Sequence, residues 1–158
     1  MDPEAKKKAL RMINYGMYVL SSRVEGHVAA ATVNWLSQAS FNPPLVMVGL
    51  KVQSDTFATV RKAMHFTVNI LGQNQKDLAQ DFFKASSVEG NRINGHEYEN
   101  GSTGGAILKE SPASFECKVT DIIERGDHAV VLGEVIEAHL TREDKPLFMR
   151  DTGWFYGG

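Results

Sequence analysis

Hydrophobic positions along the chain follow two different periods, which predict a helix at the start and mainly strands after it. Behind Asp2-Pro3-Glu4, a good opening for a helix, Leu10, Ile13 and Met17 recur at helical spacing. We therefore expect a helix over residues 3–14. Further along, apolar residues alternate with polar ones or form short runs, as strands do. The expected strands are 17–22, 27–35, 45–50, 65–71, 114–124 and 127–141, with two short pieces in the tail, 147–149 and 154–156.

Turns, helices and a polar stretch separate these strands. Residues 23–26 form a hairpin-like turn, and Asn42-Pro43-Pro44 breaks the chain. Residues 54–64 and 74–83 carry apolar side chains at helical spacing, so we expect two more helices there. Residues 84–104 are polar, contain several glycines and show little periodicity, which indicates a long loop.

The order of the elements favours an antiparallel architecture, because strand follows strand without regular helical crossovers. We expect a mainly β fold, an antiparallel barrel with flanking helices, rather than a doubly wound sheet. The length of 158 residues is ordinary for one domain and no linker or repeat interrupts it, so a single domain over 1–158 is expected. A content of 42% hydrophobic and 23% charged residues argues against disordered and coiled-coil classes.

Charge and cysteine content restrict the partners and the compartment. The formal net charge is −2, whereas a broad nucleic-acid-binding surface needs a basic excess, so no nucleic-acid partner is expected. The single cysteine, Cys117, leaves no internal disulfide, and its place on an alternating strand favours a buried structural thiol. No apolar run reaches about 18 residues and the N-terminus has no signal-peptide pattern. We expect a cytoplasmic protein without a membrane partner.

Several kinds of chemistry have no motif in the chain. The five histidines are scattered without the spacing of a metal site, so no metal ligand is expected. The sequence contains no GxSxG, GxGxxG or GxxxxGK[ST], so neither a serine nucleophile elbow nor a Rossmann or P-loop nucleotide site is indicated.

One continuous segment, residues 31–56, concentrates polar side chains. Short hydroxyl and amide groups precede the Pro-Pro break, and a buried strand then leads to Lys51, Ser54 and Thr56 at a helix start. Free N–H groups at a helix N-terminus, with hydroxyls and a lysine beside them, suit a phosphate monoester. The alternative is that Ser54 only caps the helix and the other hydroxyls satisfy turns and strand edges.

Residues 31–56 also resemble the cofactor-binding segment of the flavin reductase family, whose members are FMN-binding split barrels. Three further pieces are similar to the same family in the same order: residues 65–71, residues 115–119, and Gly126-Asp127-His128 followed by residues 131–135. The resemblance covers residues 15–156. It implies an antiparallel FMN-binding split β-barrel that assembles as a homodimer.

The resemblance also implies roles for individual residues. It places one group along the edge of the isoalloxazine ring: Thr32, Val33 and Asn34. It places a second group near the ribityl chain and the phosphate: Ser37, Gln38, Ala39 and Ser40. It completes the phosphate pocket with a third group: Lys51, Ser54 and Thr56. His128 is expected as a catalytic residue that orients the nicotinamide or the reduced ring, against the alternative of a turn histidine bonded to Asp127.

The activity implied by the resemblance is that of an NAD(P)H-dependent flavin reductase, with FMN favoured over FAD. Hydride would pass from the nicotinamide to the flavin, and electrons then to free flavin, to oxygen or to an electron-accepting protein. A flavoredoxin-type FMN electron carrier, which works with a redox partner protein and lacks its own NAD(P)H activity, stays open as the alternative. So does a split barrel that holds another phosphorylated ligand. Trp154 and Tyr156 either pack on the flavin across a dimer interface or close the barrel.

Overall fold

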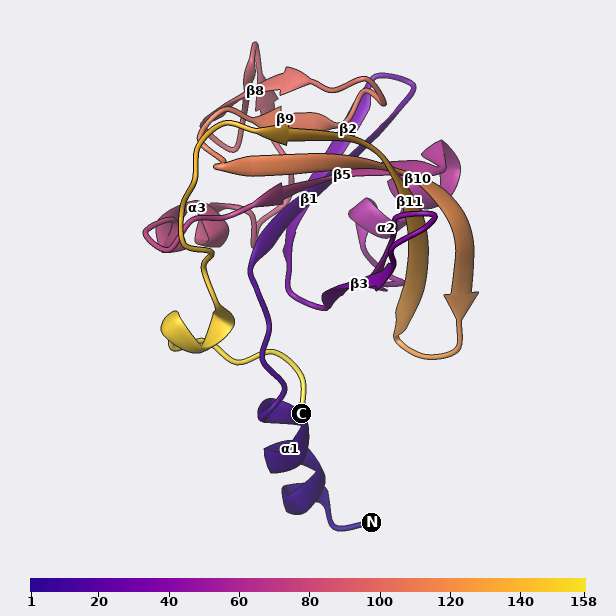
Figure 1. Ribbon diagram of the computed structural model, residues 1–158, viewed down its shortest axis with the longest axis vertical. Helices are drawn as coiled ribbons and strands as arrows, with labels where there is room; N and C mark the ends of the chain where they lie inside the picture. Colours follow the sequence, from indigo (N-terminus) through magenta and orange to yellow (C-terminus); the bar gives the residue numbers. More distant parts are fainter.

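Seven antiparallel strands form one strongly curved sheet, which is the barrel seen in Figure 1. The computed structural model describes residues 1–158. The order across the sheet is β2-β1-β5-β10-β11-β4-β3. The strands are β1 (Tyr18–Val24), β2 (His27–Val33), β3 (Leu36–Ser40), β4 (Leu45–Lys51), β5 (His65–Ile70), β10 (Ala113–Glu124) and β11 (His128–Leu140). The two edge strands, β2 and β3, are joined only by residues 34–35, so the opening of the barrel lies at that connection.

Local sequence explains the tight connection between the first two strands. Glu25 and Gly26 both have positive φ, 49° and 83°, which a two-residue turn of the mirror-image type requires. Val24 therefore faces His27, and the register continues to the pair Tyr18 and Val33. The expected hairpin is confirmed with a shorter turn than 23–26.

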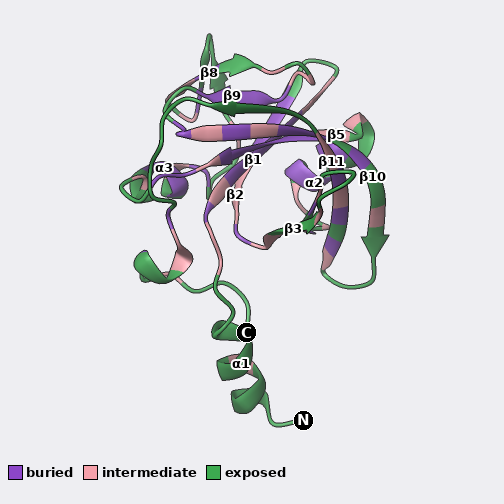
Figure 2. Cartoon of the chain, in the orientation of Figure 1, coloured by how far each residue is buried: buried purple, intermediate pink, exposed green.

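Three α-helices flank the sheet. They are α1 (Pro3–Arg11), α2 (Asp55–Ala63) and α3 (Lys76–Asp81), each shorter than its expected range. The N-cap Asp2 accepts a hydrogen bond from the Glu4 amide, but no residue of α1 is buried, and the helix projects from the body (Figures 1 and 2). By contrast, α2 buries one face against β1 and β2 and ends at Met64, whose φ is 56°. No helix is long and apolar enough to cross a membrane.

The prediction of a long loop over residues 84–104 is wrong. This stretch contributes to a second, four-stranded sheet made of β6 (Val88–Glu89), β7 (Arg92–Ile93), β8 (His96–Asn100) and β9 (Ala106–Leu108). Strands of two to five residues are too short for a visible period, and their stability comes from tertiary contacts. Ile93, Tyr98 and Leu108 are buried in one apolar cluster together with Phe82 of the α3 end.

Other expected boundaries also changed. The strand expected over 27–35 ends at Val33, and β3 follows as a separate strand that the polar residues 37–40 gave no reason to expect. In the tail, 147–149 makes a single bridge between Phe148 and Gly16 and then a 3-10 turn, η1 (Met149–Asp151), while 154–156 forms no strand.

Two apolar clusters make up the interior. One fills the barrel and includes Leu20, Phe66 and Val131, and the other lies between α3 and the second sheet. Cys117 belongs to the barrel cluster, and burial raises the pKa of its thiol to about 12. A thiol with such a pKa is not nucleophilic at neutral pH, which agrees with the structural role expected for it.

Buried polar groups attach the second sheet to the barrel. Asn69 on β5 accepts from the Leu108 amide at 2.8 Å and donates to the Ala106 carbonyl at 3.0 Å. Glu116 on β10 is completely buried and accepts from the amide and the hydroxyl of Thr103, both at 2.7 Å. A Cβ atom on Gly101 would lie 2.5 Å from the Glu116 carboxylate, so only glycine allows the chain to come this close.

Glu116→Gln should lower the free energy of unfolding by about 1–3 kcal/mol at neutral pH, since charged hydrogen bonds to the 102–103 amides are weakened. Hydrogen bonds from Thr103 and Ser102 outweigh the desolvation of the carboxylate and lower its pKa from 4.5 to about 2. The contribution of Glu116 to the free energy of unfolding is therefore complete above about pH 4.5 and is lost as the pH falls toward 2. Urea unfolding across this range measures the effect in wild type and variant.

The matched control is Glu99→Gln on β8, an exposed carboxylate without an ion pair or hydrogen bond. It should change the free energy of unfolding by less than about 0.5 kcal/mol. If the Glu116→Gln protein keeps the full acid sensitivity of the wild type between these pH values, Glu116 is not the source of that sensitivity.

Candidate functional site

A cavity of about 500 Å³ opens at the end of the barrel where the edge strands meet. Its size falls within the usual range for small-molecule sites. Six parts of the chain line it: the residue before β1, the end of β2, the end of β4 with the start of α2, the segment after α3, the start of β11, and the C-terminal tail. The lining residues are Met17, Ala31, Thr32, Val33, Asn34, Gly49, Leu50, Lys51, Ser54, Thr56, Phe82, Phe83, His128, Met149, Trp154, Phe155 and Tyr156.

One end of the cavity is electropositive because α2 begins there. The Ser54 hydroxyl accepts from the Phe57 amide at 3.0 Å and donates to the Lys51 carbonyl at 2.7 Å, so it is fully used as the helix cap. Thr56 is buried, yet its hydroxyl makes no hydrogen bond within the chain. The Lys51 ammonium forms no salt bridge, although its charge helps to lower the pKa of the Asp127 carboxyl. The helix N-terminus, one unpaired cation and one unpaired hydroxyl together suit an anion.

The end of β2 forms a second wall, and its side chains are held by the segments beside it. The Thr32 hydroxyl donates to the Ala79 carbonyl at 2.6 Å, and the Asn34 amide donates to the Met149 sulfur at 2.9 Å. These bonds direct both polar side chains to neighbouring protein atoms. What β2 offers a ligand is therefore mainly its backbone and the carbonyl oxygen of the Asn34 side chain.

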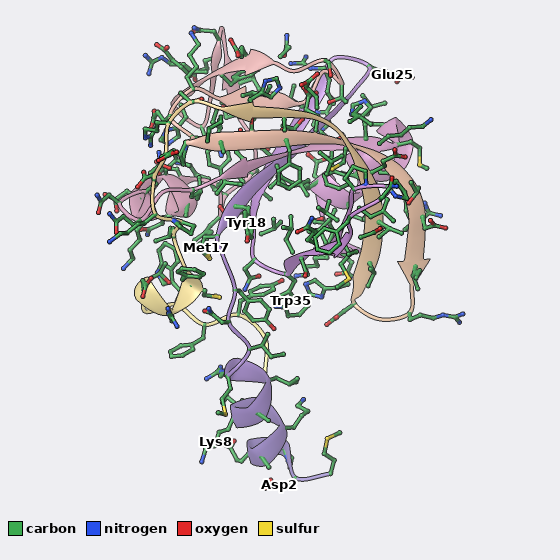
Figure 3. The ribbon with its side chains drawn as sticks, in the orientation of Figure 1. Asp2, Lys8, Met17, Tyr18, Glu25 and Trp35 are labelled. Carbon is green, nitrogen blue, oxygen red and sulfur yellow. The ribbon has the colours of Figure 1, made fainter.

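The opposite wall is aromatic. Phe83 meets Trp154 edge-on with ring centroids 4.8 Å apart, and Trp35 packs 4.5 Å from His128 behind the lining. Figure 3 labels Trp35 at the end of the barrel that faces α1. A cavity with an aromatic wall beside an anion-binding end suits a ligand that carries an aromatic ring and a phosphate.

His128 lies at the start of β11, directly opposite Lys51 on β4. Its Nδ1 atom is 2.8 Å from the Asp127 carboxylate, and its Nε2 atom is 2.8 Å from the Tyr156 hydroxyl. The sequence left open whether this histidine serves the site or merely bonds to Asp127. The structure combines both features, because His128 bonds to Asp127 and also lines the cavity.

Seven of the eleven expected site residues come together here. They are Thr32, Val33, Asn34, Lys51, Ser54, Thr56 and His128. Four do not line the cavity of this chain: Ser37, Gln38, Ala39 and Ser40. The reason is the antiparallel register of β3, which pairs Ser37 with Met47 and Ser40 with Leu45, so that the strand runs away from the Lys51 end.

The tail residues were the least accessible to sequence reasoning. Trp154 and Tyr156 stood only as alternatives, and Phe155 and Met149 were not expected in the site at all. The density of aromatic residues in the last five positions was the one available signal. No group of three or more His, Cys, Asp or Glu side chains is placed to hold a metal ion.

Comparison with known proteins agrees with this geometry. Residues 10–157 match the model of the "Flavin reductase like domain" family. The chain belongs to this family. The flavin reductase-like domain is 33% identical over 135 residues to a "Probable flavin reductase" of Rhizobium meliloti. The aligned region covers 85% of this chain and 42% of that protein. It is 31% identical to the "NADH:riboflavin 5'-phosphate oxidoreductase" of Streptomyces pristinaespiralis, over 80% of this chain and 68% of that one.

Solved structures extend the similarity to the whole fold. The native flavin reductase PheA2 superimposes with a TM-score of 0.79 at 27% identity, covering 94% of this flavin reductase-like domain and 93% of that chain. The domain spans only 42 to 64% of the length of three curated relatives that it matches.

Ser54→Ala should lower the free energy of unfolding by about 1 kcal/mol, because the first turn of α2 loses its cap. Ser37→Ala, which removes a hydroxyl from an exposed position of β3 outside the cavity, should change it by less than about 0.5 kcal/mol. Urea unfolding of the ligand-free proteins measures both. Equal stability of the two variants would show that the hydroxyl of Ser54 does not stabilise the helix.

Proposed function

We propose that this domain binds FMN in the cavity and catalyses hydride transfer from NAD(P)H to the flavin. The observation that carries the proposal is the pairing, within one cavity, of a helix N-terminus that suits an anion with a wall of aromatic side chains. FMN has a phosphate monoester at one end and a planar ring system at the other. The name of the Streptomyces relative, an NADH:riboflavin 5'-phosphate oxidoreductase, supports the same choice of flavin and donor.

The residues present fit the flavin phosphate. A phosphate dianion needs positive charge and hydrogen-bond donors, because a half-buried unpaired anion is unfavourable. Lys51 would supply the charge, and the hydroxyl of Thr56 and the first amides of α2 would supply donors. The Ser54 hydroxyl is engaged in the cap, so we assign it the role of holding the amides in place rather than binding the phosphate itself.

The bound flavin supplies the ring that accepts hydride, and the protein supplies position and shelter. In the proposed complex the ring edge lies along Thr32, Val33 and Asn34. Trp154 and Phe155 exclude water from one side of the cavity, and Nε2 of His128 lies where it would orient the nicotinamide. Hydride transfer between two stacked rings depends chiefly on their alignment, so the site needs no acid–base pair.

Several finer assignments belong to this proposal. FMN is preferred over FAD because the phosphate end is a helix N-terminus with a single lysine. The preference between NADH and NADPH is left to the titration below. We propose a homodimer in a reducing cytoplasm, with free flavin or an electron-accepting protein as the next electron acceptor. Ser37, Gln38, Ala39 and Ser40 are left out of the proposed pocket.

Purified protein loaded with FMN should lose its yellow absorbance when titrated anaerobically with NADH or NADPH, because the flavin accepts the hydride. The donor that bleaches the flavin at the lower concentration is the preferred substrate. Bound flavin that stays yellow with both donors, but is reduced by a redox partner protein, would replace the reductase with an electron carrier. Protein that binds no flavin would limit the relationship to the fold.

Lys51→Ala should weaken FMN binding about 10- to 100-fold, the loss for one charge-assisted hydrogen bond, and Thr56→Val about 2- to 10-fold. Riboflavin, which lacks the phosphate, should bind all variants with nearly the affinity it has for wild type. Fluorescence titration of the flavin measures each dissociation constant. If Lys51→Ala weakens riboflavin and FMN equally, the lysine does not contact the phosphate.

A further inference from the structure

The last six residues form a strap, residues 153–158, that closes one side of the cavity. The strap begins at Gly153, whose φ of 78° lies in the left-handed region. None of its residues takes part in a backbone–backbone hydrogen bond. Aromatic contacts hold it instead, together with three hydrogen bonds that involve side chains. These join the Trp154 amide to Thr152, the Gly157 carbonyl to Arg11 at 3.4 Å, and the Tyr156 hydroxyl to His128.

This strap is the wall of the cavity that is held by the fewest backbone hydrogen bonds. Every other wall belongs to a hydrogen-bonded strand or helix, or follows one directly. Segments with few buried contacts and no backbone hydrogen bonds open at low free energy. The end of the strap also covers Trp35: a Cβ atom on Gly157 would lie 2.8 Å from Cζ2 of that indole. The Nε1 atom of the same indole is buried without a hydrogen-bond partner, which is unfavourable.

The neighbours of His128 determine which tautomer its neutral ring adopts. The hydrogen bond from His128 lowers the pKa of the Asp127 carboxyl, so Asp127 is ionised at neutral pH and can only accept a hydrogen bond. In the neutral form of the imidazole the hydrogen atom therefore sits on Nδ1, and Nε2 is the acceptor. Burial raises the pKa of Tyr156, whose hydroxyl keeps its proton and donates it to Nε2. In the closed state both ring nitrogens of His128 are occupied.

We propose that the Tyr156 hydroxyl occupies the position on Nε2 of His128 that the carboxamide of the nicotinamide takes in the complex with NAD(P)H. The carboxamide displaces the hydroxyl when the strap opens. This inference rests on the proposed function. Nε2 of His128 accepts, so the incoming group must carry a hydrogen-bond donor, as the amide nitrogen of a carboxamide does. Tyr156 is thus a specificity-determining residue. Its hydroxyl can be replaced on Nε2 of His128 by another group that donates a hydrogen bond, such as a carboxamide. A ring that carries a carboxylate has no such donor and cannot replace it.

The first test removes only the hydroxyl. Tyr156→Phe should tighten the binding of NADH about 2- to 10-fold, because NADH no longer has to replace the hydrogen bond between Tyr156 and His128. The gain should appear as a lower KM. Saturation of the anaerobic reduction rate measures it. Tyr15→Phe is the matched control, since this hydroxyl lies beside the strap without a hydrogen bond. If Tyr156→Phe instead weakens NADH binding or leaves it unchanged, Tyr156 does not compete with the donor.

A second test addresses the chemistry of the exchange. The reduced dinucleotide with nicotinic acid in place of nicotinamide should bind about 10- to 100-fold more weakly than NADH, because its carboxylate cannot donate to Nε2. Asp127→Asn should reduce this discrimination, because an amide can itself donate to Nδ1 and then no longer fixes the tautomer. Unchanged discrimination in Asp127→Asn would overturn the assignment of Nε2 as the acceptor.

A third readout does not depend on flavin or hydride transfer. The chain has two tryptophans: Trp35 contacts the strap, and Trp154 belongs to it. In the FMN-free protein, acrylamide should quench their fluorescence more strongly in Tyr156→Phe than in wild type or Tyr15→Phe. Arg11→Gln, which releases the other end of the strap without touching His128, should act in the same direction.

The readouts separate the two proposals. Wild-type protein that NAD(P)H does not reduce would refute the proposed reductase, while the quenching still reports whether Tyr156 holds the strap closed. Quenching that is the same in wild type, Tyr156→Phe and Arg11→Gln would refute the strap, whatever the enzyme does with NADH.

Discussion

The antiparallel pairing of β4 with β11 decides where the chemistry of this domain lies. It sets His128 opposite Lys51, so the histidine and the cation at the start of α2 come from different hairpins yet stand side by side. The strand order then brings the end of β2 to the same opening, because β2 and β3 are the edges of one curved sheet. A shift of one residue in this register would turn Lys51 to the other face of the sheet and remove the cation from the cavity.

The cavity combines rigid and movable walls. Strand ends and the N-terminus of α2 are fixed by backbone hydrogen bonds, which suits a cofactor that stays in place. The tail that completes the aromatic wall has none. Such a division lets one ligand be held for many turnovers while a second ligand enters and leaves, provided that the second one approaches through the tail.

The sequence predicted most strands of the barrel better than it predicted β3 and the second sheet, for a physical reason. In strands such as β5 and β11, apolar residues alternate with polar ones or form long runs. This local pattern can be recognised without knowledge of the fold. β3 and the short strands β6 to β9 carry no such period, since their positions depend on partners far away in the chain, such as Asn69 and Glu116. The same limit applies to the site. The residues around the helix start belong to one continuous segment, whereas Tyr156 reaches His128 only through the folded tail.

The end of α1 meets the C-terminal strap beside the cavity. Arg11 of α1 stacks on Phe155 and bonds to the Gly157 carbonyl, and the C-terminus lies beside α1 in Figure 1. A polypeptide fused to the C-terminus, including a purification tag, therefore begins beside the cavity, whereas the N-terminus lies at the far end of α1 (Figure 1). Rates measured on a tagged protein would report on the fusion as well as on the enzyme, and the position of the tag would become a kinetic variable.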